Sequence, residues 1–510
     1  MTDLISLAPK LDTSSQAFFR FRNIPNTTKT LITNYEGFYA LLSKEEFERF
    51  ATGTIEPNTP LHQRLSENNF LRATYDSKRA ADRLWSRRQM LAQGPNLHML
   101  VVTLRCNESC VYCHASRATM DRVDTDMSKE TAEKAIDLIL QSPNPNLTIE
   151  FQGGEPLVAF DVVKHAIQYA NEKNKKAGKQ LEFTMVTNMS LMDEEKLKFL
   201  LENRVQLCTS IDGPEHLHDL QRKLPRAPGG DGVGRKDGAH ATAVKWIKRI
   251  NEEWQKMGLD PTLYRVEALL TTTRDALPLW KEIVDTYVDL GCRALFLRPV
   301  DPFGWAEKTE RKVEYPREEY LQFYKNVVDY MIELNAKGVQ VLERYAAIFL
   351  SKFFGRDPNF LDLRSPAGAG IGALAYNYDG RVFSSDEGRM LHEMGDSSFE
   401  IGHVATSTYK ELVGHPTVRS EVLASNLDGQ PDCVNCTYNP YCGTQTAHNH
   451  KKFGTVFGRT RESTLCSVHK GIQDYLFERL AAEDPKVLDI FQKWTTNRPR
   501  THFLQPTTPA

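Results

Sequence analysis

Three cysteines on one short stretch of chain are the residues whose chemistry is easiest to name. Cys106, Cys110 and Cys113 stand in Leu-Arg-Cys-Asn-Glu-Ser-Cys-Val-Tyr-Cys, directly after the apolar run 97–104. Three thiolates on a short loop can hold three irons of a cubane iron–sulfur cluster. The fourth iron then has no protein ligand and can bind a small molecule. This spacing therefore predicts a catalytic cluster rather than a purely structural one.

A zinc site is the alternative for the same loop. Zinc sites usually bring a fourth Cys or His close by. His114 is adjacent to Cys113, but the side chains of neighbouring residues rarely ligate one ion well. We therefore expect an iron–sulfur cluster here and keep zinc as the competing hypothesis.

A second group of cysteines lies near the C-terminal end of the chain, at Cys433, Cys436, Cys442 and Cys466. Four cysteines can saturate one cluster, and a structural zinc on the same four is the alternative. The chain has nine cysteines, an odd number that cannot all pair as disulfides. In a chain without an export signal, grouped cysteines more often ligate metals. For the remaining two, Cys208 and Cys292, we expect buried structural thiols.

Length and charge exclude several classes of protein. The 510 residues are enough for two or three domains and a large core. The formal net charge of −2 suggests neither a nucleic-acid partner nor an anionic membrane. The first residues lack the basic patch and apolar core of a secretion signal, and no apolar run approaches the roughly 18 residues that span a bilayer. We expect a soluble, cytoplasmic protein.

Short apolar runs alternate with amphipathic stretches from residue 97 onward. The runs are rich in β-branched or aromatic residues, as buried parallel strands are, and cover 97–104, 147–151, 181–187, 205–211, 264–270 and 294–297. Apolar residues at helical spacing follow in 128–141 and near 160–178, 193–203, 240–257 and 275–290. Six strand–helix units predict an α/β barrel or a doubly wound sheet.

Polar residues follow four of these predicted strands. Cys106 follows the first, Gly153-Gly154-Glu155 the second, Asn188 the third and Asp212 the fourth. In a parallel α/β barrel, the C-terminal ends of the strands form the active-site face. We therefore expect the four segments to meet at one rim.

The chain divides into four predicted parts. Residues 1–92 form a small N-terminal α+β domain, in which Ser43 and Glu46 make a capping-box pattern. Residues 93–310 form the barrel, residues 311–496 a C-terminal domain with the second cysteine group, and residues 497–510 a polar, frayed tail. The Gly-rich stretch 225–238 is expected to be a surface loop, with a substrate lid as the alternative.

The C-x3-C-x2-C spacing, with Tyr112 before its last cysteine, resembles the signature of the radical S-adenosylmethionine (SAM) superfamily. The segment Phe151-Gln-Gly-Gly-Glu-Pro156 resembles the Gly-Gly-Glu-Pro segment of that family. The resemblance implies a partial (β/α)6 barrel, agreeing with the six units above. It also implies a [4Fe–4S] cluster on Cys106, Cys110 and Cys113, whose fourth iron SAM would chelate.

The resemblance further implies roles for individual residues around SAM. Backbone groups of Gly153, Gly154 and Glu155 would receive the amine of SAM. Tyr112 would lie near the adenine. The ribose or carboxylate of SAM would be contacted by residues at two strand ends, Asn188 and Ser210.

Met189 follows Asn188 where many relatives have glycine, so we expect the local backbone to differ there. The chemistry implied is that of a cofactor enzyme, in which the protein supplies position and dryness. An electron donor such as flavodoxin or ferredoxin would reduce the cluster. The 5′-deoxyadenosyl radical released from SAM would then remove a hydrogen atom from a substrate.

The second cysteine group resembles the auxiliary-cluster domain called SPASM, or its shorter form, twitch. Full SPASM domains carry two auxiliary clusters. Segment 365–387 matches the first element of that domain in layout, yet Ala367 and Ser385 occupy expected cysteine positions and Thr446 occupies a third. The resemblance therefore implies one auxiliary [4Fe–4S] cluster, held by the four cysteines named above, and none at the other position. With no open coordination site, this cluster is expected to relay electrons.

SPASM and twitch enzymes most often modify peptides made on the ribosome. The whole chain looks most like the radical SAM maturase B family of His-Xaa-Ser peptide systems, with supporting stretches at 374–380 and 439–443. The resemblance implies oxidative cross-linking or cyclisation of a precursor peptide, with a second radical SAM protein as a further partner. The N-terminal domain loosely resembles domains that grip leader peptides by adding a strand to a sheet edge; a structural cap is the alternative.

Two other functions are kept as alternatives. One is maturation of a protein active site, as in sulfatase-modifying enzymes, which uses the same chemistry. The other is a non-catalytic zinc-binding scaffold, which explains neither the open three-cysteine loop nor the Gly-Gly-Glu segment.

No general base is evident from the sequence. Asp386, Glu387 and Arg389 lie near the lost cluster position. We expect them to form surface ion pairs, and the alternative is that they face the substrate. Histidines near the last cysteines are expected to be solvated or structural, at His448, His450 and His469.

Overall fold

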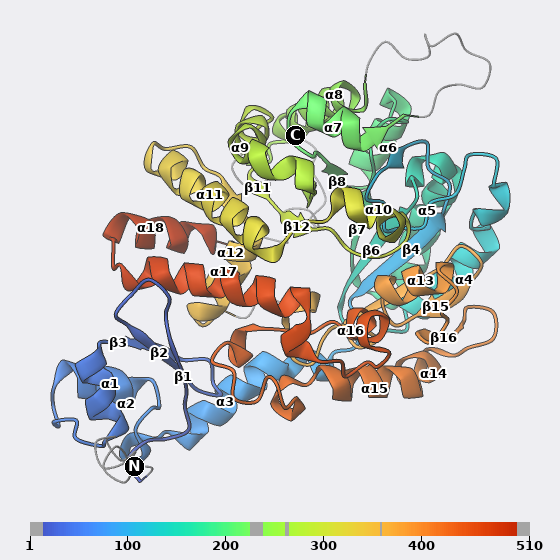
Figure 1. Ribbon diagram of the computed structural model, residues 1–510. Helices are drawn as coiled ribbons and strands as arrows, with labels where there is room; N and C mark the ends of the chain where they lie inside the picture. The colour runs from blue at the N-terminus through green and yellow to red at the C-terminus, as the bar shows by residue number, and fades with distance from the viewer. Residues whose placement is uncertain (1–13, 225–237, 261–264, 357–359, 497–510) are drawn as a thin grey trace.

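A nine-stranded sheet runs through the protein, whose computed structural model describes residues 14–224, 238–260, 265–356 and 360–496 (Figure 1). The strand order is β12-β10-β8-β7-β6-β4-β14-β15-β16. The six parallel strands of the predicted barrel are β4 (Leu97–Thr103), β6 (Asn146–Gly153), β7 (Gln180–Val186), β8 (Gln206–Ser210), β10 (Glu267–Thr272) and β12 (Leu297–Pro299).

These six strands stand side by side in chain order, without the reversal that marks a doubly wound sheet. Helices connect them, namely α4 (Lys129–Ile139), α5 (Phe160–Ala177), α6 (Glu194–Glu202), α7 (Glu215–Gln221), α8 (Ala239–Lys256) and α9 (Trp280–Asp289). The predicted partial (β/α)6 barrel is therefore confirmed. The sixth run differs in detail, because its start forms β11 (Ala294–Leu295), which pairs with β13 (Leu342–Glu343) instead.

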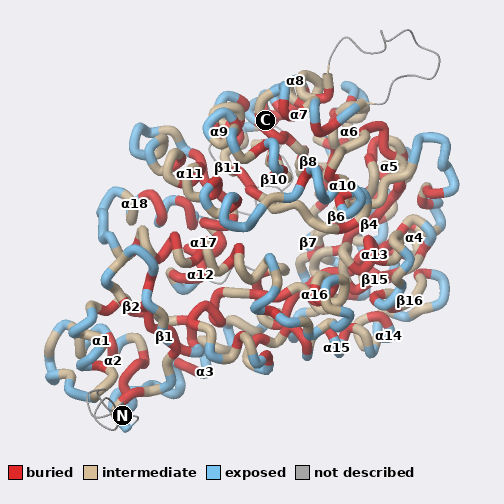
Figure 2. The backbone as a smooth tube through the Cα atoms, in the orientation of Figure 1, coloured by how far each residue is buried: buried red, intermediate tan, exposed pale blue. Residues whose placement is uncertain are grey.

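The two faces of the barrel strands have different surroundings. On β6, Leu147, Ile149 and Phe151 are fully buried in the core that includes Ile136 of α4 and Ile167 of α5. The alternate side chains of β6 are half-buried, and β7, β8 and β10 repeat this alternation. Since the outer face packs on helices, the half-buried face lines the barrel interior. The interior of the barrel is thus polar and partly exposed to solvent. Figure 2 shows the buried segments mostly inside the molecule and the exposed segments mostly at its periphery.

The C-terminal region extends the same sheet. Strand β14 (Ala373–Tyr376) runs parallel to β4, with Ala373 opposite Leu97, and β15 (Arg381–Phe383) and β16 (Glu400–His403) add antiparallel strands. Helices of this region are α10 (Trp305–Val313), α11 (Arg317–Ala336), α12 (Arg344–Phe353), α13 (Asp386–Glu393), α14 (Tyr409–Val413), α15 (Pro416–Ser425), α16 (Thr446–Phe453), α17 (Thr464–Ala481) and α18 (Pro485–Trp494). The sheet therefore continues across the predicted boundary at residue 310.

A separate three-stranded sheet, β1 (Arg20–Asn23), β2 (Thr30–Thr33) and β3 (Tyr39–Leu42), builds the N-terminal domain with α1 (Lys44–Ala51), α2 (Pro60–Glu67) and α3 (Ser77–Arg88). It has a small core of its own around Phe50, Leu65 and Phe70. The capping box of Ser43 and Glu46 is formed as predicted. Figure 1 shows this domain (blue) beside the red helix α17, where Tyr39 and Phe477 lie 5.2 Å apart between ring centroids.

Two sequence expectations fall outside the described residues, namely most of the Gly-rich stretch (225–237) and the tail 497–510. Among the described helices, none has the length and apolar character needed to cross a membrane.

Candidate active site

The three-cysteine loop begins where β4 ends, at the C-terminal end of the barrel. Its backbone is curled by hydrogen bonds from Cys106 N to Ala118 O (3.1 Å) and from Cys113 N to Cys110 O (3.3 Å). Cys106 is buried, Cys110 and Cys113 are half-buried, and no disulfide joins them. Burial raises the pKa of Cys110, and the nearby thiols of Cys113 and Cys106 contribute to the shift. The three predicted thiols therefore lie near enough to act on one another's pKa.

The Gly-Gly-Glu segment lies along the backbone that leads into the cysteine loop. Gly154 N donates to Thr103 O and Glu155 N to Arg105 O, both at 2.8 Å. A Cβ on Gly154 would stand 2.3 Å from Arg105 O, closer than any real contact. Gly153 has φ of 133°, which side-chain-bearing residues rarely adopt. Glycine is therefore required here by the close approach of two chain segments.

Glu155 joins the ends of β6 and β7. Its carboxylate accepts hydrogen bonds from Thr187 Oγ1 and from Asn188 N, both at 2.7 Å. Burial raises the pKa of Glu155 to about 7, against the effect of these hydrogen bonds. The side chain of Glu155 therefore links the ends of β6 and β7, while its backbone N–H bonds to the chain just before the cysteine loop.

Asn188, which Met189 follows in the chain, lies close to the first cysteine. Asn188 Nδ2 donates to Asn107 Oδ1 (3.2 Å) and lies 3.9 Å from Cys106 Sγ. Met189 has φ of 60°, in the left-handed region that glycine favours. Met189 therefore adopts a backbone conformation that glycine would adopt more readily.

Tyr112 is held by a buried network that the sequence did not reveal. Its hydroxyl donates to the carboxylate of Asp212 (2.5 and 2.6 Å), and Arg222 Nε donates to the same carboxylate at 3.1 Å. Ser210 lies at the end of β8, half-buried on the interior face. Asp212 was singled out only by its place after a strand, and no pattern pointed to Arg222.

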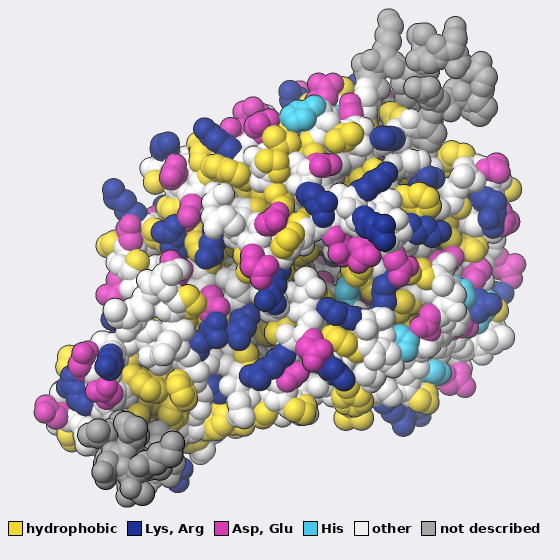
Figure 3. Space-filling view, in the orientation of Figure 1, with side chains coloured by type: hydrophobic (Ala, Val, Ile, Leu, Met, Phe, Trp, Pro, Cys, Tyr) yellow, Lys and Arg dark blue, Asp and Glu magenta, His cyan; other side chains and the backbone are white. Residues whose placement is uncertain are grey.

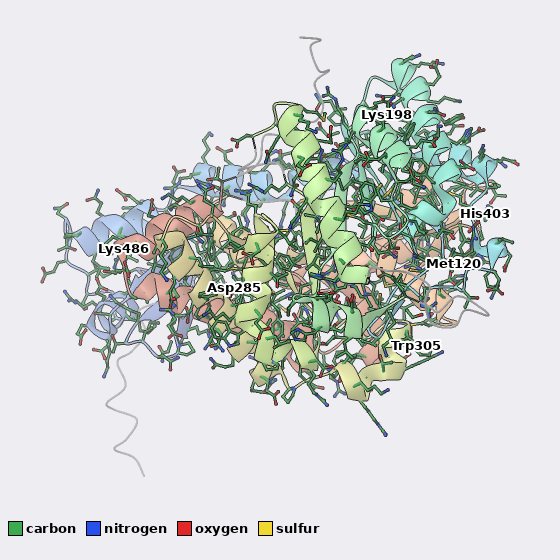
Figure 4. All side chains as sticks on the ribbon, turned by 90° about the horizontal axis from the view of Figure 1, so that it is seen from above. Met120, Lys198, Asp285, Trp305, His403 and Lys486 are labelled. Carbon is green, nitrogen blue, oxygen red and sulfur yellow. The ribbon has the colours of Figure 1, made fainter. Side chains whose placement is uncertain are left out.

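A second charged group lies at the rim, after β12. His448 Nε2 and Asp301 Oδ1 lie 2.7 Å apart. The same loop holds the cysteine loop, because Trp305 N donates to Cys113 O at 2.8 Å. Burial lowers the pKa of His448, whereas the nearby carboxylates of Asp301, Glu387 and Asp362 raise it. The carboxylates have the larger combined effect, so the net shift of this pKa is upward. The Trp305 indole is 51 % exposed and lies at the edge of the molecule (Figure 4).

The predicted ion pair of Asp386 and Arg389 forms, at 2.7 Å, but it is not on the surface. The Arg389 side chain is only 1 % exposed, and its Nη1 donates to Ala115 O of the cysteine loop at 3.2 Å. The expectation of a surface pair was wrong, since a second acceptor compensates for burial of the guanidinium. Cys208 also differs from expectation: it is half-buried on the barrel interior, whereas Cys292 is buried as predicted.

The other two histidines near the last cysteines have structural surroundings, as expected. His450 Nε2 lies 2.7 Å from Asp396 Oδ2. Burial lowers the pKa of His469 to about 4, so its imidazole is neutral at physiological pH.

The four C-terminal cysteines also meet. Cys433, Cys436 and Cys442 lie on one turn-rich segment, and Cys466 is in the first turn of α17, where Ser463 Oγ accepts its N–H at 3.0 Å. Burial raises the pKa of Cys442, and the thiols of the other three add to the shift. The four thiols of the predicted auxiliary set therefore lie near enough to act on one another's pKa.

The N-terminal domain covers this auxiliary set. Arg20 Nε donates to Val434 O and Thr33 Oγ1 to Thr437 O, both at 2.7 Å. Tyr441 OH donates to Gly37 O at 3.1 Å. These bonds fix the backbone of the auxiliary segment on both sides of Cys436.

The three positions where cysteines were expected and missing are engaged in protein hydrogen bonds. Ala367 N donates to Ser425 Oγ (3.0 Å), and Thr446 Oγ1 donates to Glu421 Oε1 (2.7 Å). Ser385 caps α13 by accepting from Gly388 N at 3.1 Å. The three positions thus form hydrogen bonds with residues of α13 and α15.

An open cleft lies on the side of Cys466. It has a volume of ≈ 400 Å³ between the end of β12, the start of α11 and the start of α17, and Ser463 and Ser467 belong to its wall. Figure 3 shows the face of the molecule that is hollowed between its upper and lower halves, with charged side chains of both signs around the hollow.

Comparison with known proteins identifies the barrel. Residues 100–266 match the radical SAM superfamily. The chain contains a radical SAM domain. A cysteine-type anaerobic sulfatase-maturating enzyme of Clostridium perfringens is 24 % identical over 404 residues, covering 76 % of this chain and 98 % of that enzyme.

Two solved structures share the fold of most of the chain. Native anSMEcpe with bound AdoMet superposes with a TM-score of 0.60 and 21 % identity, covering 78 % of this chain and 99 % of that one. Streptococcus suis SuiB bound to precursor peptide SuiA gives a TM-score of 0.52 and 13 % identity, with 89 % and 99 % covered. The barrel of this chain is therefore the radical SAM domain of an enzyme, and such a domain uses SAM and a [4Fe–4S] cluster as cofactors.

The donor sets fit these cofactors. The three-cysteine loop supplies three free thiols, and the backbone beside Gly153 and Gly154 leaves no room for side chains. Within the described residues, no three His, Cys, Asp or Glu side chains converge closely enough to hold one metal ion. A cubane places each cysteine on a different iron, so its ligands do not have to converge on a single point.

Proposed function

We propose that this radical SAM enzyme oxidatively modifies a peptide made on the ribosome, by cross-linking or cyclising a side chain. The observation that carries the proposal is the presence of two cysteine sets in one molecule. One lies on the rim of a polar barrel interior and the other under the N-terminal domain. An oxidised product requires that the substrate give up an electron as well as a hydrogen atom, and a second, fully ligated cluster suits that need.

In this proposal, Cys106, Cys110 and Cys113 hold the SAM-binding cluster. The backbone of Gly153, Gly154 and Glu155 binds the amine of SAM. When bound, the cluster and SAM supply a 5′-deoxyadenosyl radical that removes a hydrogen atom from the peptide.

The remaining SAM contacts are also part of the proposal. Asn188 and Ser210 would contact the ribose or carboxylate of SAM from two strand ends. Tyr112 would lie near the adenine, and Asp212 fixes the Tyr112 hydroxyl. Cys433, Cys436, Cys442 and Cys466 hold the auxiliary cluster. No second auxiliary cluster is bound at the three positions where cysteines are missing, which are Ala367, Ser385 and Thr446.

Our candidate for the group that takes up the proton lost by the substrate is Asp301. Burial raises the pKa of Asp301, but His448, whose Nε2 lies 2.7 Å from Asp301 Oδ1, lowers it, and His114 and Arg298 add to the lowering. The net shift of the Asp301 pKa is downward, so the carboxyl group stays ionised near neutral pH. An ionised carboxylate on the rim can accept a proton directly or through one water.

Relatives support a peptide substrate. SuiB binds the precursor peptide SuiA, and anSMEcpe binds the Kp18Cys peptide. The second candidate is maturation of a protein active site, which the similarity to the sulfatase-maturating enzyme over 76 % of this chain favours. Further partners in the proposal are an electron donor such as flavodoxin or ferredoxin and a second radical SAM protein.

Co-expression with peptides encoded beside this gene, followed by mass spectrometry, tests the proposal. We expect a peptide that loses hydrogen mass and resists fragmentation between two linked residues. A sulfatase-derived Cys or Ser peptide, offered in parallel to the purified enzyme, should remain unmodified. Modification of that peptide alone would replace the first candidate by the second.

A further inference from the structure

The strand β9 (Arg222–Lys223) clamps the cysteine loop. It pairs antiparallel with β5 (Ser109–Cys110), so Arg222 stands opposite Cys110, and Val111 N donates to Gln221 O at 2.9 Å. This pairing points the Arg222 side chain at the second cysteine, where Nη1 donates to Cys110 Sγ at 3.6 Å. The contact between Arg222 and Cys110 therefore depends on the pairing of β5 with β9 and on the direction of the Arg222 side chain.

Arg222 is a cation between two buried carboxylates. Its Nε lies 3.1 Å from Asp212 Oδ2 and its Nη1 lies 3.7 Å from Glu108 Oε2. The side chains of Arg222, Glu108 and Asp212 are 10 %, 2 % and 0 % exposed. Glu108 Oε2 is itself 3.9 Å from Cys110 Sγ. The half-buried thiol of Cys110 therefore has one cation and one carboxylate within 4 Å, and both charged side chains are shielded from solvent.

Charges at this distance act strongly on a redox group in a desolvated site. Reduction adds one negative charge, so a neighbouring cation stabilises the reduced state and a neighbouring carboxylate opposes it. A planar guanidinium can meet a carboxylate, a second carboxylate and a sulfur atom at once, which a lysine ammonium on a flexible stem does less well.

We propose that Arg222 is a positioning residue that holds Cys110 and raises the reduction potential of the cluster on the three-cysteine loop, with Glu108 opposing it. This rests on the cluster site proposed above. The reduction potential of that cluster thus depends on three residues that are not its ligands, namely Glu108, Asp212 and Arg222.

The test is a redox titration of the anaerobically reconstituted full chain, monitored by electron paramagnetic resonance without SAM at pH 8.5, with iron counted in each sample. The variants are Arg222→Gln, Arg222→Lys and Glu108→Gln, and Lys223→Gln is the control because it removes an exposed charge from the same strand. No peptide substrate and no turnover are needed.

Arg222→Gln should lower the ratio of reduced to oxidised cluster at least tenfold at a fixed potential, which is about 59 mV for a one-electron couple. Glu108→Gln should shift the ratio in the opposite direction, and Arg222→Lys and Lys223→Gln should stay within threefold of the unsubstituted protein. A merely structural role of Arg222 would not give opposite signs.

Unshifted titrations of Arg222→Gln and Glu108→Gln, or shifts of the same sign, would overturn the inference. If Arg222→Gln loses its iron, Glu108→Gln decides alone, and an unchanged midpoint in that variant overturns the inference. An unsubstituted chain that binds no iron at the loop would instead contradict the proposed cluster site.

Discussion

The carboxylate of Glu155 accepts the backbone N–H of Asn188 at 2.7 Å and so ties the second barrel strand to the third. Its own backbone N–H donates to Arg105 O at 2.8 Å, one residue before the first cysteine. A single residue therefore fixes three of the four strand ends that meet at the rim. The rim depends on this close packing of backbone segments, and the glycine beside Glu155 gives a direct way to test it.

Gly154→Ala should destabilise the protein without cofactors by about 1–3 kcal/mol, the range for overpacking. The added Cβ would meet Arg105 O and Leu104 O, which are backbone atoms that cannot rotate away. Chemical denaturation measures the loss, and SAM binding should weaken with it. Gly429→Ala is the matched control, because nothing lies within 4 Å of its Cβ position. Equal stability of the two variants would contradict the account of the rim.

The auxiliary set should be separable from the loop. Cys442→Ala should reduce the iron content of reconstituted protein from about eight to about four per chain, since one cubane is lost. With dithionite as reductant, SAM cleavage should continue. Iron and sulfide analysis together with chromatography of 5′-deoxyadenosine checks both results. An unsubstituted chain with only four irons would show that a single cluster is present.

Asp301→Asn should uncouple hydrogen abstraction from product formation. The amide keeps the size of the side chain but cannot take up a proton, so 5′-deoxyadenosine should still form while modified peptide falls at least tenfold. Thr309→Ser is a suitable control on the following helix, because it keeps the hydroxyl that donates to Val111 O. Parallel loss of both products would assign Asp301 a structural role instead.

Stability should fall with rising pH through a buried carboxyl group remote from the cysteines. Burial raises the pKa of Glu343 to about 7, and its carboxylate accepts from Tyr324 OH at 2.5 Å. Because the folded pKa lies above the unfolded value, this group stabilises the fold fully below about pH 4.5 and loses that contribution as the pH rises through 7.

Between pH 5 and pH 8, the unfolding free energy of the unsubstituted protein should therefore fall by up to about 3 kcal/mol more than that of Glu343→Gln. Denaturant titrations at both pH values measure the difference, with the exposed Glu202→Gln as control. An unchanged slope in Glu343→Gln would mean that its carboxyl group is not desolvated as described.

The repeating part of the fold could be predicted from the sequence, and the contacts between distant segments could not. Strands such as 97–103 and helices such as 129–139 are indicated by local periodicity. The pairing of Ala373 with Leu97 joins residues that are far apart in the chain and has no local signal. Sequence spacing therefore predicts the barrel but not the strand that the C-terminal region adds to it.

The site shows the same division. Cysteines and the Gly-Gly-Glu segment are rare patterns and were found, whereas Arg222 is one of many arginines and becomes distinctive only through its contacts with Cys110 and Asp212. Arg389 was expected on the surface because charged residues generally are. Its burial depends on Asp386 and on Ala115 O, an acceptor far away in the sequence.

The most direct measurement is 5′-deoxyadenosine production by the anaerobically reconstituted chain with SAM and dithionite. The account predicts this product from the unsubstituted chain and none from Cys110→Ala. Absence of the product from a chain that holds its full iron, or an undiminished yield from Cys110→Ala, would contradict a SAM-cleaving cluster on the three-cysteine loop.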